Sequence, residues 1–276
     1  MKKNPTLSNT IVFIAGAFIG MNCWDGWKMY FESRGYRCII VPWPYKDASP
    51  EELRNRNPEV NIASVRLSSI VDGIATFIDS LPEKPILIGH SLGGLIVQLL
   101  LQRGLGCAGV AVHSFPALGG GRRVFSLLRG WWDAMGFFSP AGVSYLMPFK
   151  RWKDDFTNGM SYGQQKQLYY TYAVPESKLL IRDLLSSRAK PDFANMPGPL
   201  LIISGSLDRV SPSALNRLNY KKYLSAGATV FYKEFNGLNH LVFAGSRWGE
   251  IPDNIVSWLD ELCPGGAQGA SRLWEI

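Results

Sequence analysis

A serine lies in a glycine-bounded turn between two apolar runs of the sequence. Residues 89–94 read Gly-His-Ser-Leu-Gly-Gly; they follow the apolar run 85–88 and open the apolar stretch 92–103. The first run has the length of a buried strand, and the second has the length of a helix. A sharp turn between strand and helix exposes the hydroxyl of Ser91, and it requires glycine where the two elements approach each other. The pattern G-x-S-x-G in this context predicts that Ser91 is a nucleophile.

The hydroxyl of a serine is a poor nucleophile until a base takes its proton, and the chain has three histidines. His90 adjoins Ser91, so the two side chains should point apart, and His113 ends an apolar run and is expected to be structural. His240 follows the last apolar run, in a loop expected at the carboxyl edge of the sheet. We therefore predict that His240 is the base; a histidine in an ordinary surface loop is the alternative.

A base histidine needs an acceptor for its other ring N–H, which fixes the tautomer and stabilises the imidazolium. Asp208 comes directly off the apolar run 200–204, whereas the competing position, after the run that ends at His113, carries no acid. The chain order Ser91, Asp208, His240 is typical of a serine in a strand-turn-helix motif of this kind. These three residues are the predicted catalytic triad.

Acyl transfer to serine also needs donors for the negative charge that develops on the carbonyl oxygen. The backbone N–H of Leu92, at the start of the helix after the serine, is one expected donor. The N–H of Ala17 is assigned as the second, because Gly16 and Gly20 let the loop after the first strand turn close to a substrate. A plain glycine turn between strand and helix would have the same sequence, so this loop alone does not decide the chemistry.

Short apolar runs alternate with helical patterns along most of the chain, which is typical of a parallel sheet covered by helices on both faces. The expected strands are 11–15, 38–41, 85–88, 109–113, 200–204 and 228–233. The expected helices are 25–34, 63–80, 92–103, 212–224 and 254–262. The sequence thus predicts an α/β fold in which the triad residues follow strands and meet at the carboxyl edge of the sheet.

The alternation stops between residues 116 and 197, where the chain becomes rich in glycine and aromatic residues. Helices are expected near 124–135, 162–173 and 176–187. We interpret 116–197 as a helical cap over the carboxyl edge, 1–115 and 198–263 as the core, and 264–276 as a flexible tail. An insertion that only extends the core is the alternative. The predicted apolar substrate pocket is lined by Phe18, Phe115, Trp131, Trp132, Phe138 and Leu241.

The composition of the 276 residues excludes several classes of protein. Apolar residues make up 46% and charged residues 18%, which excludes a disordered chain. The net charge is +7, but the basic residues are scattered, so nucleic-acid binding is not expected. The four cysteines lie far apart without metal-ligand spacing, which favours reduced thiols, a cytoplasmic location and no metal site. No apolar run reaches the ~18 residues of a membrane span, so no stable membrane insertion is expected.

Together, these motifs resemble the α/β-hydrolase superfamily, in its serine carboxylesterase and lipase-like branch. The resemblance rests on residues 89–94, on Ser-Gly-Ser-Leu-Asp-Arg-Val-Ser-Pro at 204–212, on Asn239-His240, and on 15–20 leading to Trp24. It covers nearly all of the chain outside the insertion. It implies a mostly parallel sheet of about six strands, flanking helices and a helical cap. Where many relatives have His-Gly, this chain has Ala-Gly at positions 15 and 16.

The expected activity is hydrolysis of carboxylic esters with an apolar acyl or aromatic part, through an acyl-enzyme on Ser91 and without a metal or organic cofactor. The same triad could instead serve thioester or lactone hydrolysis, carbon–carbon bond cleavage, cyanohydrin lysis or cofactor-free perhydrolysis, because pocket shape decides between them. A receptor that binds a ligand without turnover is a further alternative. The expected partner is a small-molecule ester, and the oligomeric state is left open.

Overall fold

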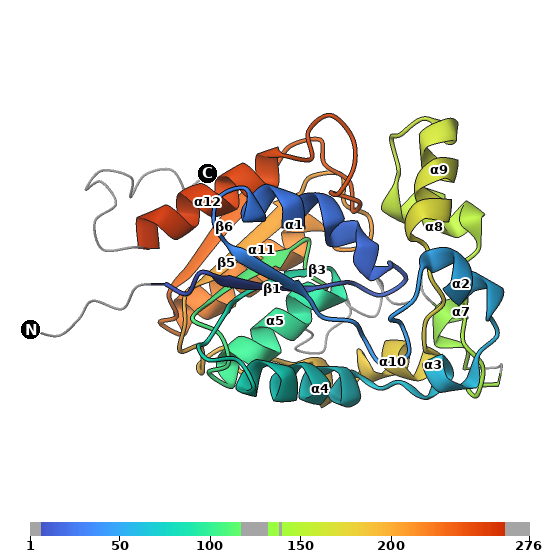
Figure 1. The fold of residues 1–276 in the computed structure, drawn as a ribbon, viewed down its shortest axis with the longest axis horizontal. Helices are drawn as coiled ribbons and strands as arrows, with labels where there is room; N and C mark the ends of the chain where they lie inside the picture. Colours follow the sequence, from blue (N-terminus) through green and yellow to red (C-terminus); the bar gives the residue numbers. More distant parts are fainter. Residues whose placement is uncertain (1–6, 117–131, 138–139, 263–276) are drawn as a thin grey trace, which may run out of the picture.

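Six strands form one central sheet in the order β2-β1-β3-β4-β5-β6 (Figure 1). The computed structural model describes residues 7–116, 132–137 and 140–262. The strands are β1 (Thr10–Ile14), β2 (Arg37–Ile40), β3 (Ile86–His90), β4 (Ala108–Val112), β5 (Leu200–Gly205) and β6 (Val230–Phe235). All neighbouring strands pair in parallel. The predicted α/β fold with a parallel sheet of six strands is confirmed.

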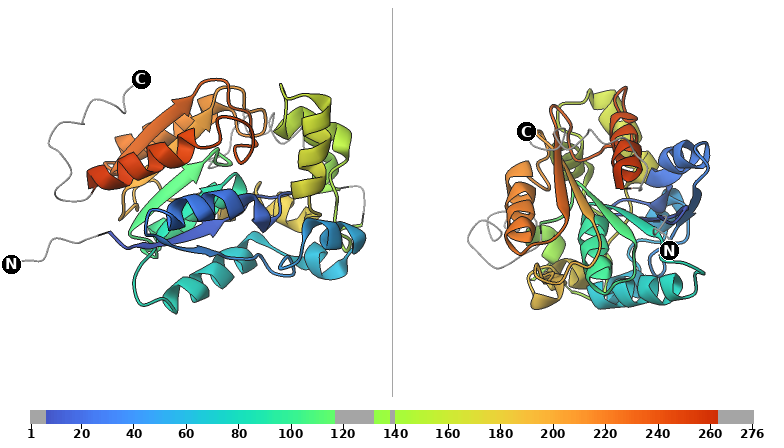
Figure 2. Two further views of the ribbon diagram at one scale, coloured as in Figure 1. Left: turned by 45° about the horizontal axis from the view of Figure 1, so that its top comes forward. Right: turned by 90° about the vertical axis from the view of Figure 1, so that its left-hand side faces the viewer.

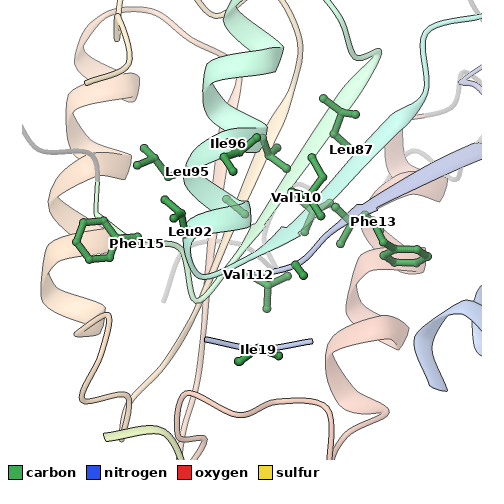
Figure 3. Packing of buried hydrophobic residues seen from close by; sticks show 14 of the residues in the cluster. Phe13, Ile19, Leu87, Leu92, Leu95, Ile96, Val110, Val112 and Phe115 are labelled. Atoms are coloured by element: carbon green, nitrogen blue, oxygen red, sulfur yellow. The ribbon is translucent and has the colours of Figure 1, made fainter. Parts of the chain in front are cut away.

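The four strands β1, β3, β4 and β5 are buried along their whole length, because helices cover the sheet from both sides. The helices α1 (Asp25–Glu32) and α12 (Glu250–Leu262) lie on one face (Figures 1 and 2). The other face is covered by α4 (Leu67–Asp79), α5 (Leu92–Gln102) and α11 (Ser213–Ser225). Figure 3 shows side chains of α5 in one apolar layer with those of the central strands. The chain thus fixes α5, and the serine before it, in the middle of the core.

A second group of helices lies beyond the carboxyl ends of the strands (Figure 1). From the segment between β4 and β5 come α7 (Trp132–Met135), α8 (Phe149–Phe156), α9 (Tyr162–Tyr172) and α10 (Lys178–Asp183). The helices α2 (Pro50–Asn55) and α3 (Val60–Ser64), which follow β2, pack against α9 and α10 respectively. The short 3-10 turns are η1 (Met21–Trp24) and η2 (Ser187–Ala189). The inserted helices therefore stand over the edge where the triad residues are expected.

The helix expected over residues 63–80 is two helices. α3 ends at Ser64 and α4 begins at Leu67, with Val65 and Arg66 in extended backbone. The N–H of Leu67 donates to the carboxylate of Asp183 in α10 at 3.1 Å. A distant carboxylate thus satisfies the first turn of α4, at a point where the apolar pattern of the sequence shows no break.

Two further helices, α2 and α8, were not expected. α2 begins with a capping box, in which Ser49 and Glu52 exchange hydrogen bonds between side chain and backbone. The helix expected over 176–187 is the shorter α10, and most of the one expected over 124–135 lies outside the described residues. In the part of the chain that the structure describes, no helix has the length and apolar character needed to cross a membrane.

Candidate active site

The serine motif forms a tight turn between β3 and α5. Ser91 has φ 55° and ψ −120°, a conformation that a residue with a side chain adopts only under strain. A Cβ on Gly89 would lie 2.2 Å from the carbonyl oxygen of Gly93, and a Cβ on Gly93 would lie 2.2 Å from that of Ile14. Glycine is therefore required at both positions, and the close approach that it permits sets the direction of the Ser91 side chain.

Asp208 and His240 meet in the loops that follow β5 and β6. The Nδ1 of His240 donates to Oδ2 of Asp208 at 2.8 Å, and both side chains are fully buried. Oδ1 of Asp208 accepts the backbone N–H groups of Val210 and Ser211, each at 2.8 Å. Because Nδ1 carries the proton, Nε2 of His240 carries the lone pair, and Nε2 has no hydrogen-bond partner among the described residues. The arrangement leaves one basic nitrogen open for proton transfer.

No hydrogen bond joins Nε2 of His240 to Ser91 within the described residues. Such contacts often tighten only in the complex with substrate. The two residues are nevertheless linked through His90, whose Nε2 donates to the backbone carbonyl of His240 at 2.8 Å. The rings of His90 and His240 lie 4.6 Å apart. The residue next to the serine thus holds the backbone of the predicted base.

His113, expected from sequence to be structural, also reaches this cluster. Its Nδ1 lies 3.0 Å from Oδ2 of Asp208, and its side chain is fully buried. Its backbone has φ 47°, in the left-handed region. A Cβ on Gly205 would lie 2.5 Å from the ring of His113, so the glycine at the end of β5 makes room for it. The contact depends on β4 and β5 being neighbours in the sheet and on this left-handed backbone, which no sequence pattern indicates.

Burial and charge act in opposite directions on these groups. Burial lowers the pKa of His90 well below its usual value, and the neighbouring imidazoles of His240 and His113 lower it further. Burial likewise lowers the pKa of His113, against the attraction of Asp208. Although burial alone would raise the pKa of Asp208, the charges and hydrogen bonds of His240 and His113 hold that pKa well below its ordinary value. Asp208 is therefore an ionised acceptor at neutral pH, whereas burial favours the neutral form of His90 and of His113.

The loop after β1 carries the second predicted donor for an oxyanion, Ala17. A Cβ on Gly16 would lie 2.8 Å from Cβ of Ser91, so only glycine lets this loop pass the serine so closely. The other predicted donor, Leu92, is the first residue of α5, and its N–H has no acceptor within the helix. Leu92 thus adjoins Ser91 in the chain, and the loop that carries Ala17 passes close to Ser91 at Gly16.

The predicted pocket residues fall into two groups. Phe18, Phe115 and Leu241 are buried, with 2% or less of each residue exposed. Trp131 and Phe138 lie outside the described residues, and Trp132 begins α7 while its side chain lies outside them.

Sequence reasoning missed Phe156 of α8, whose ring lies 5.0 Å from that of His240 and whose carbonyl accepts the N–H of Leu241 at 3.0 Å. The sequence marks Phe156 only as one of many aromatic residues in the inserted segment, so nothing singled it out. Phe156 gives the insertion a direct contact with the loop that carries the predicted base.

One ligand atom from each of His113, Asp208 and His240 lies within 4.8 Å of the others, which is the donor set of a metal site. A metal bound there would occupy the Asp208 oxygen or the histidine nitrogens that the hydrogen bond between Asp208 and His240 uses. Metal binding and proton relay therefore exclude each other in this cluster.

Residues 11–251 match the protein family described as the alpha/beta hydrolase family. The chain is a member of that family. The match includes β1 from its second residue onward, the other five strands and the segment inserted between β4 and β5. The membership predicted from the serine motif and the loops after β1, β5 and β6 is thereby confirmed.

Individual relatives are distant. Norfluorocurarine synthase 2 from Strychnos is 28% identical over 99 residues, which is 36% of this chain and 35% of that protein. The match therefore spans about a third of that relative's length. The solved structure of the methylesterase MES16 from Arabidopsis is similar with a TM-score of 0.64 at 15% identity, over 92% of this chain and 99% of the other. Tomato methylketone synthase I, in complex with 2-tridecanone, gives 0.66 at 17% identity over 92% and 99%. These similarities show the shared fold.

Proposed function

We propose that the protein is a serine hydrolase that cleaves carboxylic esters through an acyl-enzyme intermediate. The observation that carries the proposal is the buried pair of Asp208 and His240, which leaves Nε2 of His240 without a partner among the described residues and is joined through His90 to the strained turn at Ser91. Membership of the alpha/beta hydrolase family and the likeness to a methylesterase support the same class of reaction.

In the proposed mechanism, Nε2 of His240 takes the proton of the Ser91 hydroxyl as Oγ attacks the ester carbonyl. The N–H groups of Leu92 and Ala17 stabilise the oxyanion, and Asp208 stabilises the imidazolium through Nδ1. His240 then gives its proton to the leaving alcohol. A water molecule activated by the same nitrogen attacks the acyl-enzyme, and the acid leaves as Ser91 recovers its proton.

The proposed substrate has an apolar acyl or aromatic part. Support comes from the apolar side chains near the site, among them Phe156 beside His240 and the buried Phe18 and Phe115. These groups offer a substrate dispersion contacts and few polar partners. The activity named for tomato methylketone synthase I is a reason to include β-keto acids and other carbon–carbon bond substrates in the first assays, because the fold alone does not fix the reaction.

The change Ser91→Ala tests the proposal. The purified protein should hydrolyse p-nitrophenyl esters of short and medium chain length, and Ser91→Ala should lower kcat by about 10⁴-fold or more, since the nucleophile is lost. A fluorophosphonate should label Ser91, as located by mass spectrometry. The matched control is Ser114→Ala, which removes another buried hydroxyl, one bonded to Gln98, and should leave kcat within about threefold.

Two results would overturn the proposal. Unchanged hydrolysis by Ser91→Ala would exclude Ser91 as the nucleophile. Labelling of Ser91 without multiple turnovers on any ester, thioester, lactone or cyanohydrin would favour a receptor over an enzyme.

A further inference from the structure

A buried ion pair joins the core to the inserted segment, close to the loop that carries Ala17. Nζ of Lys46, in the loop after β2, lies 2.5 Å from Oε2 of Glu176, which precedes α10. The side chain of Lys46 is 6% exposed and that of Glu176 is 0% exposed, so the two charges face each other almost completely shielded from solvent. Burial lowers the pKa of Lys46, and the carboxylate of Glu176 acts in the opposite direction. An isolated charge at this depth would be costly, so each residue depends on the other.

The carboxylate of Glu176 also binds the backbone of the loop after β1. Oε2 accepts the N–H of Phe18 at 3.2 Å, while Oε1 accepts the N–H of Ser177 at 3.0 Å. Phe18 has φ 63°, a left-handed conformation that needs support from its surroundings in a residue with a side chain. The hydrogen bond that the N–H of Phe18 donates to Glu176 supplies that support next to Ala17.

The same loop pairs with the segment before Glu176 along its length. Ile19 and Ala173 form an antiparallel bridge. The N–H of Gly20 donates to the carbonyl of Tyr172 at 2.8 Å, and the N–H of Val174 donates to that of Phe18 at 3.2 Å. Residues 18–20 are thus held by residues 172–176 of the insertion, and Glu176 is the only charged member of that segment.

These contacts determine which backbone N–H groups of the loop can donate a hydrogen bond to a substrate. The N–H of Phe18 donates to Glu176 and the N–H of Gly20 donates to Tyr172, so neither is available to a substrate. The bond to Glu176 also fixes the peptide plane that follows Ala17, whose N–H is the predicted donor of this loop. A bare carboxylate so close to a developing oxyanion would repel it, and the ammonium of Lys46 neutralises that charge. The ion pair therefore combines two effects, orientation of the loop and cancellation of an adverse charge.

We infer that Glu176 and Lys46 are positioning residues of the oxyanion hole: the Lys46–Glu176 pair fixes the loop of residues 17–20 so that the N–H of Ala17 points at the developing oxyanion. This inference rests on the proposed function. Neither residue touches the reacting atoms; both act through the backbone of Ala17 and Phe18.

The change Glu176→Gln tests the inference. It keeps the shape but leaves Lys46 unpaired, and it should lower kcat by about tenfold to hundredfold while KM changes by less than about threefold, because a misplaced donor weakens transition-state binding more than substrate binding. Affinity for a trifluoromethyl ketone, which forms an oxyanion with Ser91, should fall in parallel with kcat/KM. Affinity for the carboxylic acid product should not.

Asp183→Asn is the matched control. Asp183 is likewise a buried carboxylate of the insertion that accepts one backbone N–H, from Leu67, and pairs with cations, here Arg66 and Arg188. It contacts α4, far along the chain from the oxyanion loop. The control should lower the thermal midpoint of unfolding without changing kcat by more than about threefold. Equal losses of kcat in Asp183→Asn and Glu176→Gln would mean that both pairs only hold the insertion in place, and would overturn the inference.

A double change separates positioning from stability. Lys46→Met with Glu176→Met removes both charges at once, and replacement of a buried ion pair by apolar side chains is often neutral for stability. The double variant should therefore unfold at a higher temperature than Lys46→Met alone, yet its kcat should stay about tenfold or more below the parent, because the acceptor for Phe18 is gone. Recovery of kcat together with stability would overturn the inference.

The rate of Ser91 labelling by a fluorophosphonate distinguishes failure of this inference from failure of the proposed function. A parent protein that is neither labelled nor active on esters would refute the proposed function. An active, labelled parent whose Glu176→Gln variant is labelled at the same rate would refute the role of Glu176 alone.

Discussion

Asp208 faces donors on both of its carboxylate oxygens. Oδ1 takes two backbone N–H groups, and Oδ2 lies 2.8 Å from Nδ1 of His240 and 3.0 Å from Nδ1 of His113. The backbone donors come from residues just after Asp208 itself, so they hold the carboxylate in one rotamer. That rotamer presents Oδ2 to both rings, and the orientation of His240 follows from it.

The change Asp208→Asn is expected to abolish most activity without unfolding the protein. An amide would offer N–H or C=O to His240 and favour the wrong tautomer, and kcat on a p-nitrophenyl ester should fall by about 10³- to 10⁴-fold. Circular dichroism should remain that of the parent. The control Asp72→Asn removes an exposed carboxylate that pairs with Arg103 on the surface, and should have no effect on kcat. A loss below about tenfold in Asp208→Asn would assign the acid to another residue.

The residues of the triad could be proposed from sequence because each follows an apolar run, and parallel strands bring their carboxyl ends to one edge. The contact of His113 with Asp208 could not be predicted from the apolar runs alone. It depends on β4 and β5 being neighbours in register, with the N–H of His113 donating to the carbonyl of Ile203 at 2.7 Å. It also depends on the left-handed backbone of His113, which no pattern in the sequence indicates.

At the scale of elements, the serine turn is built by β3, α5 and β4 together. The N–H of Ser91 donates to the carbonyl of Val112 at 3.0 Å, and the carbonyl of Ser91 accepts the N–H of Phe115 at 2.8 Å. Both backbone groups of the strained residue are therefore held by the neighbouring strand and the loop after it. The strain at Ser91 is offset by contacts outside its own turn.

The change Gly93→Ala is expected to destabilise the protein by about 3 kcal/mol or more, because its Cβ would overlap the backbone of β1. Gly73→Ala in α4 is the matched control, since its Cβ would meet nothing within 4 Å. It should stabilise the protein by about 0.5–1 kcal/mol through helix propensity. Urea denaturation measures both, and where Gly93→Ala yields no soluble protein, the soluble yield replaces it. A Gly93→Ala protein as stable as the parent would contradict the close approach of α5 and β1.

Strands and long helices were predictable because their apolar patterns are local. The break between α3 and α4 was not, since the carboxylate that satisfies Leu67 comes from Asp183, more than 100 residues later in the chain. α2 could have been found from its sequence, because Ser49 and Glu52 have the spacing of a capping box and a proline stands at the first helical position. The pairing of residues 18–20 with 172–176 could not be predicted either, because a single β-bridge leaves no periodic pattern of apolar residues in the sequence.

For the whole molecule, the buried histidines tie stability to pH. His90 and His113 have lowered pKa values when folded, whereas in the unfolded chain each would gain a proton near pH 6.5. The unfolded state therefore binds more protons as pH falls below that value, and the free energy of unfolding should decrease by roughly 1–3 kcal/mol between pH 7 and pH 5. The contribution of Asp208, whose folded pKa is lowered, is lost only in more acidic solution.

Guanidinium denaturation at pH 7, 6 and 5 checks this dependence. The variant His90→Gln removes one of the two groups, and its free energy of unfolding should fall less steeply over the same range. A free energy that stays constant or rises as pH falls to 5 would contradict the neutral state of these histidines.

The hydrogen bond from His90 to the carbonyl of His240 has a consequence for redesign of the protein. In a G-x-S-x-G signature, the first variable position invites randomisation, since it adjoins the nucleophile without being one. Here that position anchors the loop of the predicted base, so libraries that aim at new selectivity should keep His90 and diversify elsewhere.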